Sequence, residues 1–260
     1  MADVFYNVLH ERAMLDPAVQ AIRKVDYACG KAGYRQLMAP YARTDLARNA
    51  ICQLFLEKSH SDDDWLVMLD CDHDHPQDIV TRLTTLEEES YHQMGVVGAL
   101  AFRRSEPYEP LFFIRDQYKV LRAPAEFEIG PVYQCQVVAT SAIAIRRWVF
   151  TQLAAHGHAW PWFQYEYVTG LPSEDMYFAK ICEDSGIHHY CDSSTIIPHL
   201  TWDWIELNKF QNYVKAHQNL VEPIQGQTMK TYRVEAQDED PHIEKVPSMP
   251  ALRKMEGVAV

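Results

Sequence analysis

Residues 65–76, WLVMLDCDHDHP, limit the fold of this chain more than any other stretch. The segment begins with five apolar residues, 65–69, which suffice for one buried strand and are too few for an ordinary helix. Acidic and imidazole side chains follow at once, and Pro76 ends the segment. A buried strand that delivers acids at its carboxyl end is typical of an open α/β sheet, where ligands bind beyond the carboxyl ends of the strands. The segment therefore predicts an α/β protein with a binding site at that edge.

The three acids of this segment suggest a divalent metal site. Side chains alternate along an extended chain, so Asp70, Asp72 and Asp74 would share one side. Three neighbouring carboxylates repel one another unless a cation lies among them. A simple turn is the alternative, because Asp and Pro both favour turns. This segment alone supports the two interpretations equally.

Strand-like and helix-like patterns alternate over the first hundred residues. The clearest helix is 46–58, whose apolar residues recur at spacings of three and four, with Thr44 or Asp45 as the expected N-cap. The other expected elements are strands at 4–9, 65–69 and 94–102, a weaker strand at 34–41, and helices at 16–28 and 76–86. Such alternation predicts a mostly parallel central sheet flanked by helices.

The second part of the chain has a less regular pattern. Pro, Gly and charged residues separate the apolar runs, which favours a small mixed sheet and a C-terminal helix. The expected elements are strands at 111–114, 118–121 and 133–145 and helices at 146–155, 174–185 and 204–220. The aromatic stretch 159–172 is a candidate loop over a site. Beyond residue 222 the chain is polar and contains Pro, which indicates a loosely attached tail.

Composition narrows the class of protein. With 260 residues, 47% of them apolar and 23% charged, the chain can bury a substantial core as one domain. A net charge of −12 argues against broad attraction to nucleic acid or anionic membranes, although a local basic groove stays compatible with it. The six cysteines lack paired spacing, no signal-peptide pattern opens the chain, and no apolar run is long enough for a membrane span. We therefore expect a soluble, cytoplasmic protein.

Several short blocks, taken in order, resemble a known family. They are RTDLARN at 43–49, MLDCDHDHP at 68–76, GALAFRR at 98–104, VVATSAIAIRRWVF at 137–150, SEDMYFAKICEDSG at 173–186 and IIPHL at 196–200. In this order and spacing they resemble the GT-A fold glycosyltransferases, of the small single-domain, family 2-like type found in bacteria and phages. The resemblance covers about residues 1–202. Two features depart from it: the first strand lacks a proline-ended entry to the nucleotide site, and Thr140 and Ser141 replace a frequent glycine pair.

The resemblance implies a domain plan and a metal site. Residues 1–222 would form the GT-A domain, with a nucleotide-binding half at 1–102, an acceptor-binding half at 103–222 and a tail at 223–260. Asp72 would bind Mn²⁺ or Mg²⁺ directly, Asp70 would contact the donor ribose or share the ion, and His199 would complete the ligand set. An imidazole ligand favours Mn²⁺ over Mg²⁺. For His73, Asp74 and His75, turn roles are favoured over further ligands.

The resemblance also implies catalytic and donor-binding residues. Asp175 would take the proton from the acceptor hydroxyl and Glu174 would orient it, although acids are stabilised in a first helical turn without any such role. Donor contacts are expected from two groups of residues: Asp45, Arg48 and Asn49 at the start of a helix, which suits anions, and Arg103 and Arg104. A capping turn and an exposed surface are the respective alternatives. Trp160, Trp162, Phe163 and Tyr165 are candidates for a sugar-stacking platform or for core packing.

These residues together predict a metal-dependent transferase that moves a hexose from a nucleotide-sugar, a UDP-sugar, to a hydroxyl group, with inversion. The acceptor stays open: a saccharide, a lipid-linked sugar, a protein, a small molecule or a modified nucleobase. Three other functions compete. They are a nucleotidyltransferase, which the lack of a glycine-rich phosphate loop disfavours, a two-metal hydrolase built on residues 70–75, and a sugar-nucleotide-binding module without turnover.

Overall fold

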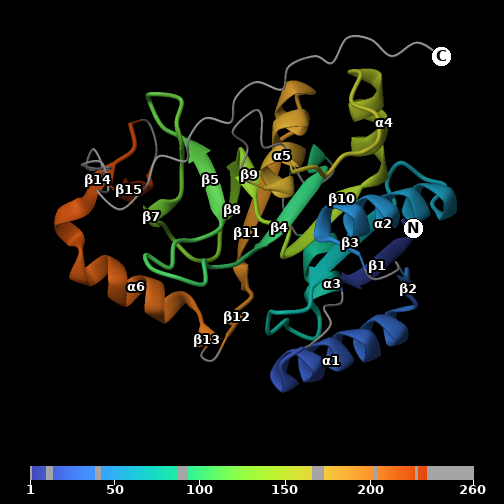
Figure 1. Ribbon diagram of the computed structural model, residues 1–260, viewed down its shortest axis with the longest axis horizontal. Helices are drawn as coiled ribbons and strands as arrows, with labels where there is room; N and C mark the ends of the chain where they lie inside the picture. The colour runs from blue at the N-terminus through green and yellow to red at the C-terminus, as the bar shows by residue number, and fades with distance from the viewer. Residues whose placement is uncertain are drawn as a thin grey trace, which may run out of the picture.

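A seven-stranded sheet forms the centre of the protein (Figure 1), in the order β2-β1-β3-β10-β4-β11-β8. The computed structural model describes residues 2–9, 14–38, 42–86, 93–165, 173–201, 204–225 and 228–232. The strands of the central sheet are β1 (Val4–Leu9), β2 (Arg35–Gln36), β3 (Trp65–Asp70), β4 (Val96–Leu100), β8 (Val132–Cys135), β10 (Ala142–Arg146) and β11 (His189–Ile196).

Most strands of this sheet run in one direction. β1 is parallel to β2 and β3, and β11 is parallel to β4, whereas β10 lies antiparallel between β3 and β4 and β8 is antiparallel to β11. Five of the seven strands therefore share a direction, which confirms the predicted α/β class with a mostly parallel sheet. The carboxyl ends of β3, β4 and β11 and the amino end of β10 consequently meet at one edge.

Helices cover both faces of the sheet (Figure 1). One face packs against α1 (Asp16–Ala32) and α3 (Ile79–Thr84), and the other against α2 (Thr44–Lys58), α4 (Arg147–Ala155) and α5 (Glu174–Asp184). Strand β3 serves both faces because its side chains alternate: Leu66 and Met68 lie in one apolar cluster, and Val67 and Leu69 lie in the other. A strand buried on both faces appears in the sequence as a continuous apolar run.

Two small sheets, a strand pair and a C-terminal helix lie beside the central sheet. The elements are β5 (Phe112–Arg115), β6 (Leu121–Arg122) and β9 (Val137–Val138) in one sheet, β7 (Pro124–Glu126), β14 (Val221–Pro223) and β15 (Lys230–Tyr232) in the other, the pair β12 (His199–Leu200) and β13 (Trp204–Ile205), and α6 (Leu207–Ala216), which is followed by a short 3-10 turn at Gln218–Leu220. The ring of Phe210 from α6 lies 5.7 Å from that of Phe102 and 6.1 Å from that of Phe127. The helix thereby covers the segment that follows β4.

Several predicted boundaries are wrong, two of them because tertiary pairing overrides a local pattern. The strand expected at 133–145 is three strands, β8, β9 and β10, which join different neighbours. The last helix begins at Leu207 rather than 204, because Trp204–Ile205 pair with His199–Leu200. The helix expected at 76–86 spans only Ile79–Thr84.

The start of α2 and the C-terminal part of the chain also differ from expectation. Neither Thr44 nor Asp45 caps α2, whose N-cap position is Arg43 and which has no capping side-chain hydrogen bond. Past residue 222 the chain is not simply a tail, because β15 pairs with β7 and Thr231 Oγ1 donates to the carbonyl of Ala123 at 2.9 Å. The boundary expected at 222 thus falls inside a small sheet. Residues 233–260, the rest of the expected tail, lie outside the described residues, as do 39–41 of the weaker strand and 166–172 of the aromatic loop.

Two expectations about the class of protein can be compared with the structure. All six cysteines are buried and unpaired, as the absence of paired spacing predicts. Among the helices that the structure describes, none is both long enough and apolar enough to cross a bilayer.

Candidate metal and donor site

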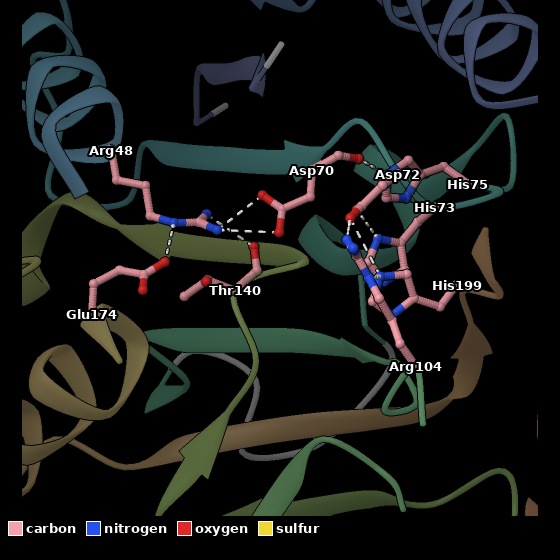
Figure 2. A network of polar contacts seen from close by, with 9 residues as sticks. All are labelled: Arg48, Asp70, Asp72, His73, His75, Arg104, Thr140, Glu174 and His199. Carbon is pink, nitrogen blue, oxygen red and sulfur yellow. Dashed lines mark hydrogen bonds and ion pairs between the residues drawn. The ribbon is translucent and has the colours of Figure 1, made fainter. Parts of the chain in front are cut away.

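Two polar clusters lie at the edge where β3, β4 and β11 end and β10 begins (Figure 2). We call the first the arginine cluster; its members are Arg48, Asp70, Thr140 and Glu174. We call the second the imidazole cluster; its members are Asp72, His73, Arg104 and His199. Asp70 ends β3 and Asp72 follows it by two residues, so β3 connects the clusters.

The imidazole cluster forms because the chain after β11 pairs with the turn after β3. His73 and His199 form an antiparallel bridge, the amide of Leu200 donates to the carbonyl of Asp72 at 2.8 Å, and that of Asp74 donates to Pro198 at 2.9 Å. The two imidazole rings stack with their centroids 4.1 Å apart. Residues that are 127 positions apart, Asp72 and His199, are thereby brought to 3.3 Å between Oδ2 and Nε2.

Hydrogen bonds determine which nitrogen of His199 faces Asp72. A carbonyl oxygen can only accept, so Nδ1 of His199 carries the proton and donates to Phe102 at 3.1 Å. Nε2 then presents its lone pair toward Oδ2 of Asp72. The guanidinium of Arg104 lies against both atoms: its Nε donates to Nε2 of His199 at 2.5 Å, and its Nη2 contacts Oδ2 of Asp72. An imidazole lone pair and a carboxylate oxygen therefore point to one place, which a cationic group occupies.

His73 holds the other carboxylate oxygen of Asp72. Its Nδ1 lies 2.7 Å from Oδ1, and the carboxylate can only accept, so Nδ1 donates. Burial lowers the pKa of His73 to about 4, against the opposing hydrogen bond to Asp72, so its ring is neutral at pH 7 and Nε2 bears a lone pair. That nitrogen is buried and has no hydrogen-bond partner among the described residues.

His75 belongs to the turn rather than to this cluster. Its Nε2 donates to the carbonyl of Asp70 at 2.6 Å, and burial lowers its pKa to about 4. Asp74, two residues beyond Asp72, accepts a long contact of 3.5 Å from the indole of Trp204. Residues 71 and 72 form a turn, so the alternation expected for Asp70, Asp72 and Asp74 does not hold beyond the end of β3.

The donor atoms of the imidazole cluster fit a divalent metal ion. One ligand atom from each of Asp72, His73 and His199 lies within 4.8 Å of the other two. A carboxylate and two imidazoles are ligands that suit divalent transition-metal ions such as Mn²⁺ better than Mg²⁺. This group contains two of the three metal ligands expected from the sequence. Asp70, the third, faces Arg48 instead, and His73, expected to be a turn residue, takes its place in the group.

The arginine cluster surrounds a buried cation. The Arg48 side chain is 2% exposed, and its Nη2 donates to the two carboxylate oxygens of Asp70 at 2.9 and 3.2 Å. Its Nη1 donates to the carbonyl of Thr140 at 3.1 Å, and its Nε to Oε1 of Glu174 at 3.4 Å. Burial opposes its charge, but the carboxylates of Asp70 and Glu174 outweigh that effect and raise the pKa of Arg48. Arg48 thus links α2, β3 and α5, and its donors are directed at protein groups.

Burial and the pairing with Arg48 have opposite effects on the pKa of Asp70. Burial raises the pKa of Asp70, and the charge of Arg48 offsets part of the increase. The Asp70 side chain keeps 26% of its exposure. It therefore remains accessible from the edge of the sheet while Arg48 compensates its charge.

Asn49 is engaged on every side by the protein. Its Nδ2 donates to the carbonyls of Asp45 at 2.8 Å and Phe163 at 2.7 Å, and its Oδ1 accepts from the amides of Trp162 at 2.8 Å and Phe163 at 3.2 Å. The side chain thus fastens the aromatic loop to α2 and is not free for a donor contact. Trp162 and Phe163 are buried, which favours the packing alternative for them, whereas Trp160 is 52% exposed.

Asp45 and Arg103, two more of the predicted donor contacts, pair with residues that belong to neither cluster. The carboxylate of Asp45 accepts two hydrogen bonds of 2.6 Å from Arg43, which lower the pKa of Asp45. Arg103 pairs with Glu109 at 2.9 Å. Neither pair places its residue in the arginine cluster or the imidazole cluster.

The predicted base lies at the start of α5. Oδ1 of Asp175 accepts hydrogen bonds from the Ser173 hydroxyl and, at 2.9 Å, from the amide of Met176. Glu174 beside it belongs to the arginine cluster, so Arg48 connects this helix end to Asp70. Burial and the neighbouring Glu174 raise the pKa of Tyr165 to about 12, so its hydroxyl keeps its proton at neutral pH.

Comparisons with known proteins bear on the fold alone. No protein-family model and no curated protein matches the sequence. Similar solved structures include protein A197 from STIV, which is 14% identical, with 77% of this chain and 86% of that chain covered and a TM-score of 0.48. They also include a mutant Drosophila β-1,4-galactosyltransferase 7 in complex with manganese, UDP-Gal and xylobiose, at 13% identity, 77% and 71% coverage and a TM-score of 0.41. A third is a glycosyltransferase involved in the glycosylation of the major capsid of PBCV-1, at 13% identity, 64% and 71% coverage and a TM-score of 0.34. The structures similar to this chain thus include glycosyltransferases, at low identity.

Proposed function

We propose that this protein is a metal-dependent glycosyltransferase that moves a hexose from a nucleotide-sugar, a UDP-sugar, to an acceptor hydroxyl. The observation that carries the proposal is the group of ligand atoms from Asp72, His73 and His199 within 4.8 Å, at the carboxyl edge of an α/β sheet. A divalent ion bound there would neutralise the charge that develops on a departing diphosphate.

The residues around the ion would divide the work. Asp72, His73 and His199 would hold it, and this ligand set suits Mn²⁺ better than Mg²⁺. Asp70 is still partly exposed and would accept a hydrogen bond from a hydroxyl of the nucleotide-sugar. Each of its carboxylate oxygens can accept a further hydrogen bond in addition to those from Arg48. Arg48 therefore acts by positioning Asp70 rather than by touching a phosphate.

The remaining predicted donor residues support the site at greater distance. Asn49 fastens Trp162 and Phe163 of the aromatic loop to α2 through three hydrogen bonds. In this proposal Asp45 and Arg103 stay paired with Arg43 and Glu109 and do not contact the donor themselves. Arg104, already against Asp72, is the residue best placed to meet an anionic group.

Asp175 would act as the base in the transfer step. The two hydrogen bonds described for its carboxylate both fall on Oδ1, so Oδ2 would take the proton from the acceptor hydroxyl as that oxygen attacks the anomeric carbon. Glu174, paired with Arg48, keeps the start of α5 aligned with Asp70. A single displacement of this kind inverts the anomeric configuration.

The proposal is tested by the release of UDP. The full chain is incubated with a panel of UDP-sugars and Mn²⁺, and UDP is measured with and without added saccharide acceptors. We expect one donor to give release that Asp72→Asn abolishes. The matched control is Asp78→Asn, which removes an acid from an exposed pair with Arg82. Release that is equal in Asp72→Asn and the unaltered protein would overturn the proposal.

A metal-dependent hydrolase is the second candidate, because two imidazole rings, those of His73 and His199, lie next to the carboxylate of Asp72. A two-metal hydrolase requires a second ion close to the first. His75, which would have to serve that ion, is instead bound to the carbonyl of Asp70. Metal analysis by mass spectrometry separates the candidates: we expect one Mn²⁺ per chain, and two would favour the hydrolase.

A further inference from the structure

Arg104 lies on the two atoms that a metal ion in the imidazole cluster would use. Its Nε is 2.5 Å from Nε2 of His199, and its Nη2 contacts Oδ2 of Asp72 (Figure 2). These atoms come from the segments after β4, β11 and β3, so the contact depends on the strand order of the sheet. The neighbouring Arg103 points to Glu109 instead.

The guanidinium and an ion cannot occupy these atoms together. A guanidinium carries donors only, and it is always charged. The lone pair of His199 Nε2 serves either the N–H of Arg104 or a metal. The same competition applies to Oδ2 of Asp72, because a guanidinium and a metal ion bound to that oxygen would repel each other.

Within this competition Arg104 is the mobile partner. Its side chain is 55% exposed, whereas the side chains of His199 and Asp72 are 10% and 20% exposed. Phe102 holds His199 through Nδ1, and His73 holds Asp72 through Oδ1. An exposed ion pair has little net stability, so the arginine can leave at small cost while the ligands stay in place.

We propose that Arg104 competes with the metal ion for Asp72 and His199 and, once displaced, pairs with the phosphates of the bound donor. The second half rests on the proposed function. A displaced Arg104 would stand beside the ion, and a guanidinium matches phosphate oxygens in paired geometry. Because the donor offers Arg104 a new partner, metal and nucleotide strengthen each other's binding, and by linkage the effect is reciprocal.

The experiment measures Mn²⁺ binding by the electron paramagnetic resonance signal of the free ion, with full-length protein and no nucleotide. We expect Arg104→Ala to bind Mn²⁺ about two- to fivefold more tightly than the unaltered protein, as removal of a weak internal competitor predicts. Arg103→Ala is the matched control, with the same charge removed one residue away, and should change the Mn²⁺ affinity less than about twofold. Arg104→Lys, which keeps a charge but lacks the fork, should lie between them.

The same titration is then repeated with saturating UDP. We expect UDP to tighten Mn²⁺ binding to the unaltered protein about tenfold more than it tightens binding to Arg104→Ala, since only the former gains charge-assisted hydrogen bonds. Only an exchange of partners makes Arg104→Ala tighten Mn²⁺ binding without UDP and weaken it with UDP. If Arg104 had a merely structural role, Arg104→Ala would weaken Mn²⁺ binding under both conditions.

The possible outcomes distinguish a failure of the competition by Arg104 from a failure of the proposed transferase function. Mn²⁺ affinity that is unchanged or weaker in Arg104→Ala overturns the competition, and so does an equal gain in Arg103→Ala, which would indicate a general charge effect. If neither the unaltered protein nor Arg104→Ala binds Mn²⁺, the metal site and the inference both fail. If the Mn²⁺ results hold but no UDP-sugar yields UDP, the competition stands and the transferase proposal fails.

Discussion

Arg48→Met is the substitution whose effect on stability follows most directly from the structure. Arg48 is the cation of the arginine cluster, and the carboxylates of Asp70 and Glu174 and the carbonyl of Thr140 all depend on it. Methionine fills a similar volume and supplies no donor. Removal of one partner from a buried ion pair typically costs about 3–5 kcal/mol, because the remaining charge is left without compensation. We expect a loss of that size in the free energy of unfolding at pH 7.5.

The loss should depend on pH in a direction that the structure determines. Burial raises the pKa of Asp70 and Arg48 lowers it in part, so without Arg48 this pKa rises further. A carboxyl group whose pKa is higher in the folded state binds protons more tightly there, so its contribution to stability falls as pH rises above about 4, the unfolded value. The deficit of Arg48→Met should therefore be smaller at pH 5.5 than at pH 7.5, by up to about 1.4 kcal/mol per pH unit for each proton.

Urea unfolding followed by tryptophan fluorescence at the two pH values measures this deficit. The double variant Arg48→Met with Glu174→Gln should recover part of the stability, since one of the two uncompensated carboxylates is then neutral. Arg82→Met, which breaks an exposed pair with Asp78, is the control and should change stability by less than about 1 kcal/mol. A deficit for Arg48→Met below about 1 kcal/mol, or one independent of pH, would refute the reasoning.

Two further predictions concern buried groups outside the proposed metal ligands. Burial lowers the pKa of His189 to about 3, so as pH drops below about 6.5 the unfolded chain takes up a proton that the folded protein does not, and stability falls. His189→Leu should reduce the slope of stability against pH by about 1.4 kcal/mol per pH unit in urea unfolding. An unchanged slope would contradict the lowered pKa of His189. Asn49→Ala should destabilise the protein by about 2–4 kcal/mol, because it leaves buried backbone groups of Trp162 and Phe163 without partners. It should also speed proteolysis within the aromatic loop, and cleavage as slow as in the unaltered protein would argue against the fastening role.

The sequence alone determined the elements whose pattern is local. The apolar run of β3 followed by acids, the spacing of apolar residues in α2, and the alternation of strands with helices identify the α/β class and the edge that carries the site. These patterns are readable because burial imposes a period of 2 on strands and 3.6 on helices, whatever the strand order. The order of the motifs also pointed to Asp72 and His199 together, which the structure places 3.3 Å apart.

Only the tertiary structure decided which of these polar residues meet. Arg48 looks the same in sequence whether it caps an exposed helix or lies buried against Glu174, 126 residues away. His73 meets His199 because the turn after β3 ends the alternation of side chains along the strand. A backbone bridge between the two residues then places their rings in a stack. Arg104 reaches His199, 95 residues away, because β4 and β11 are neighbours. Local propensity is summed over a few residues, whereas these contacts depend on strand order, which the packing of the whole chain selects.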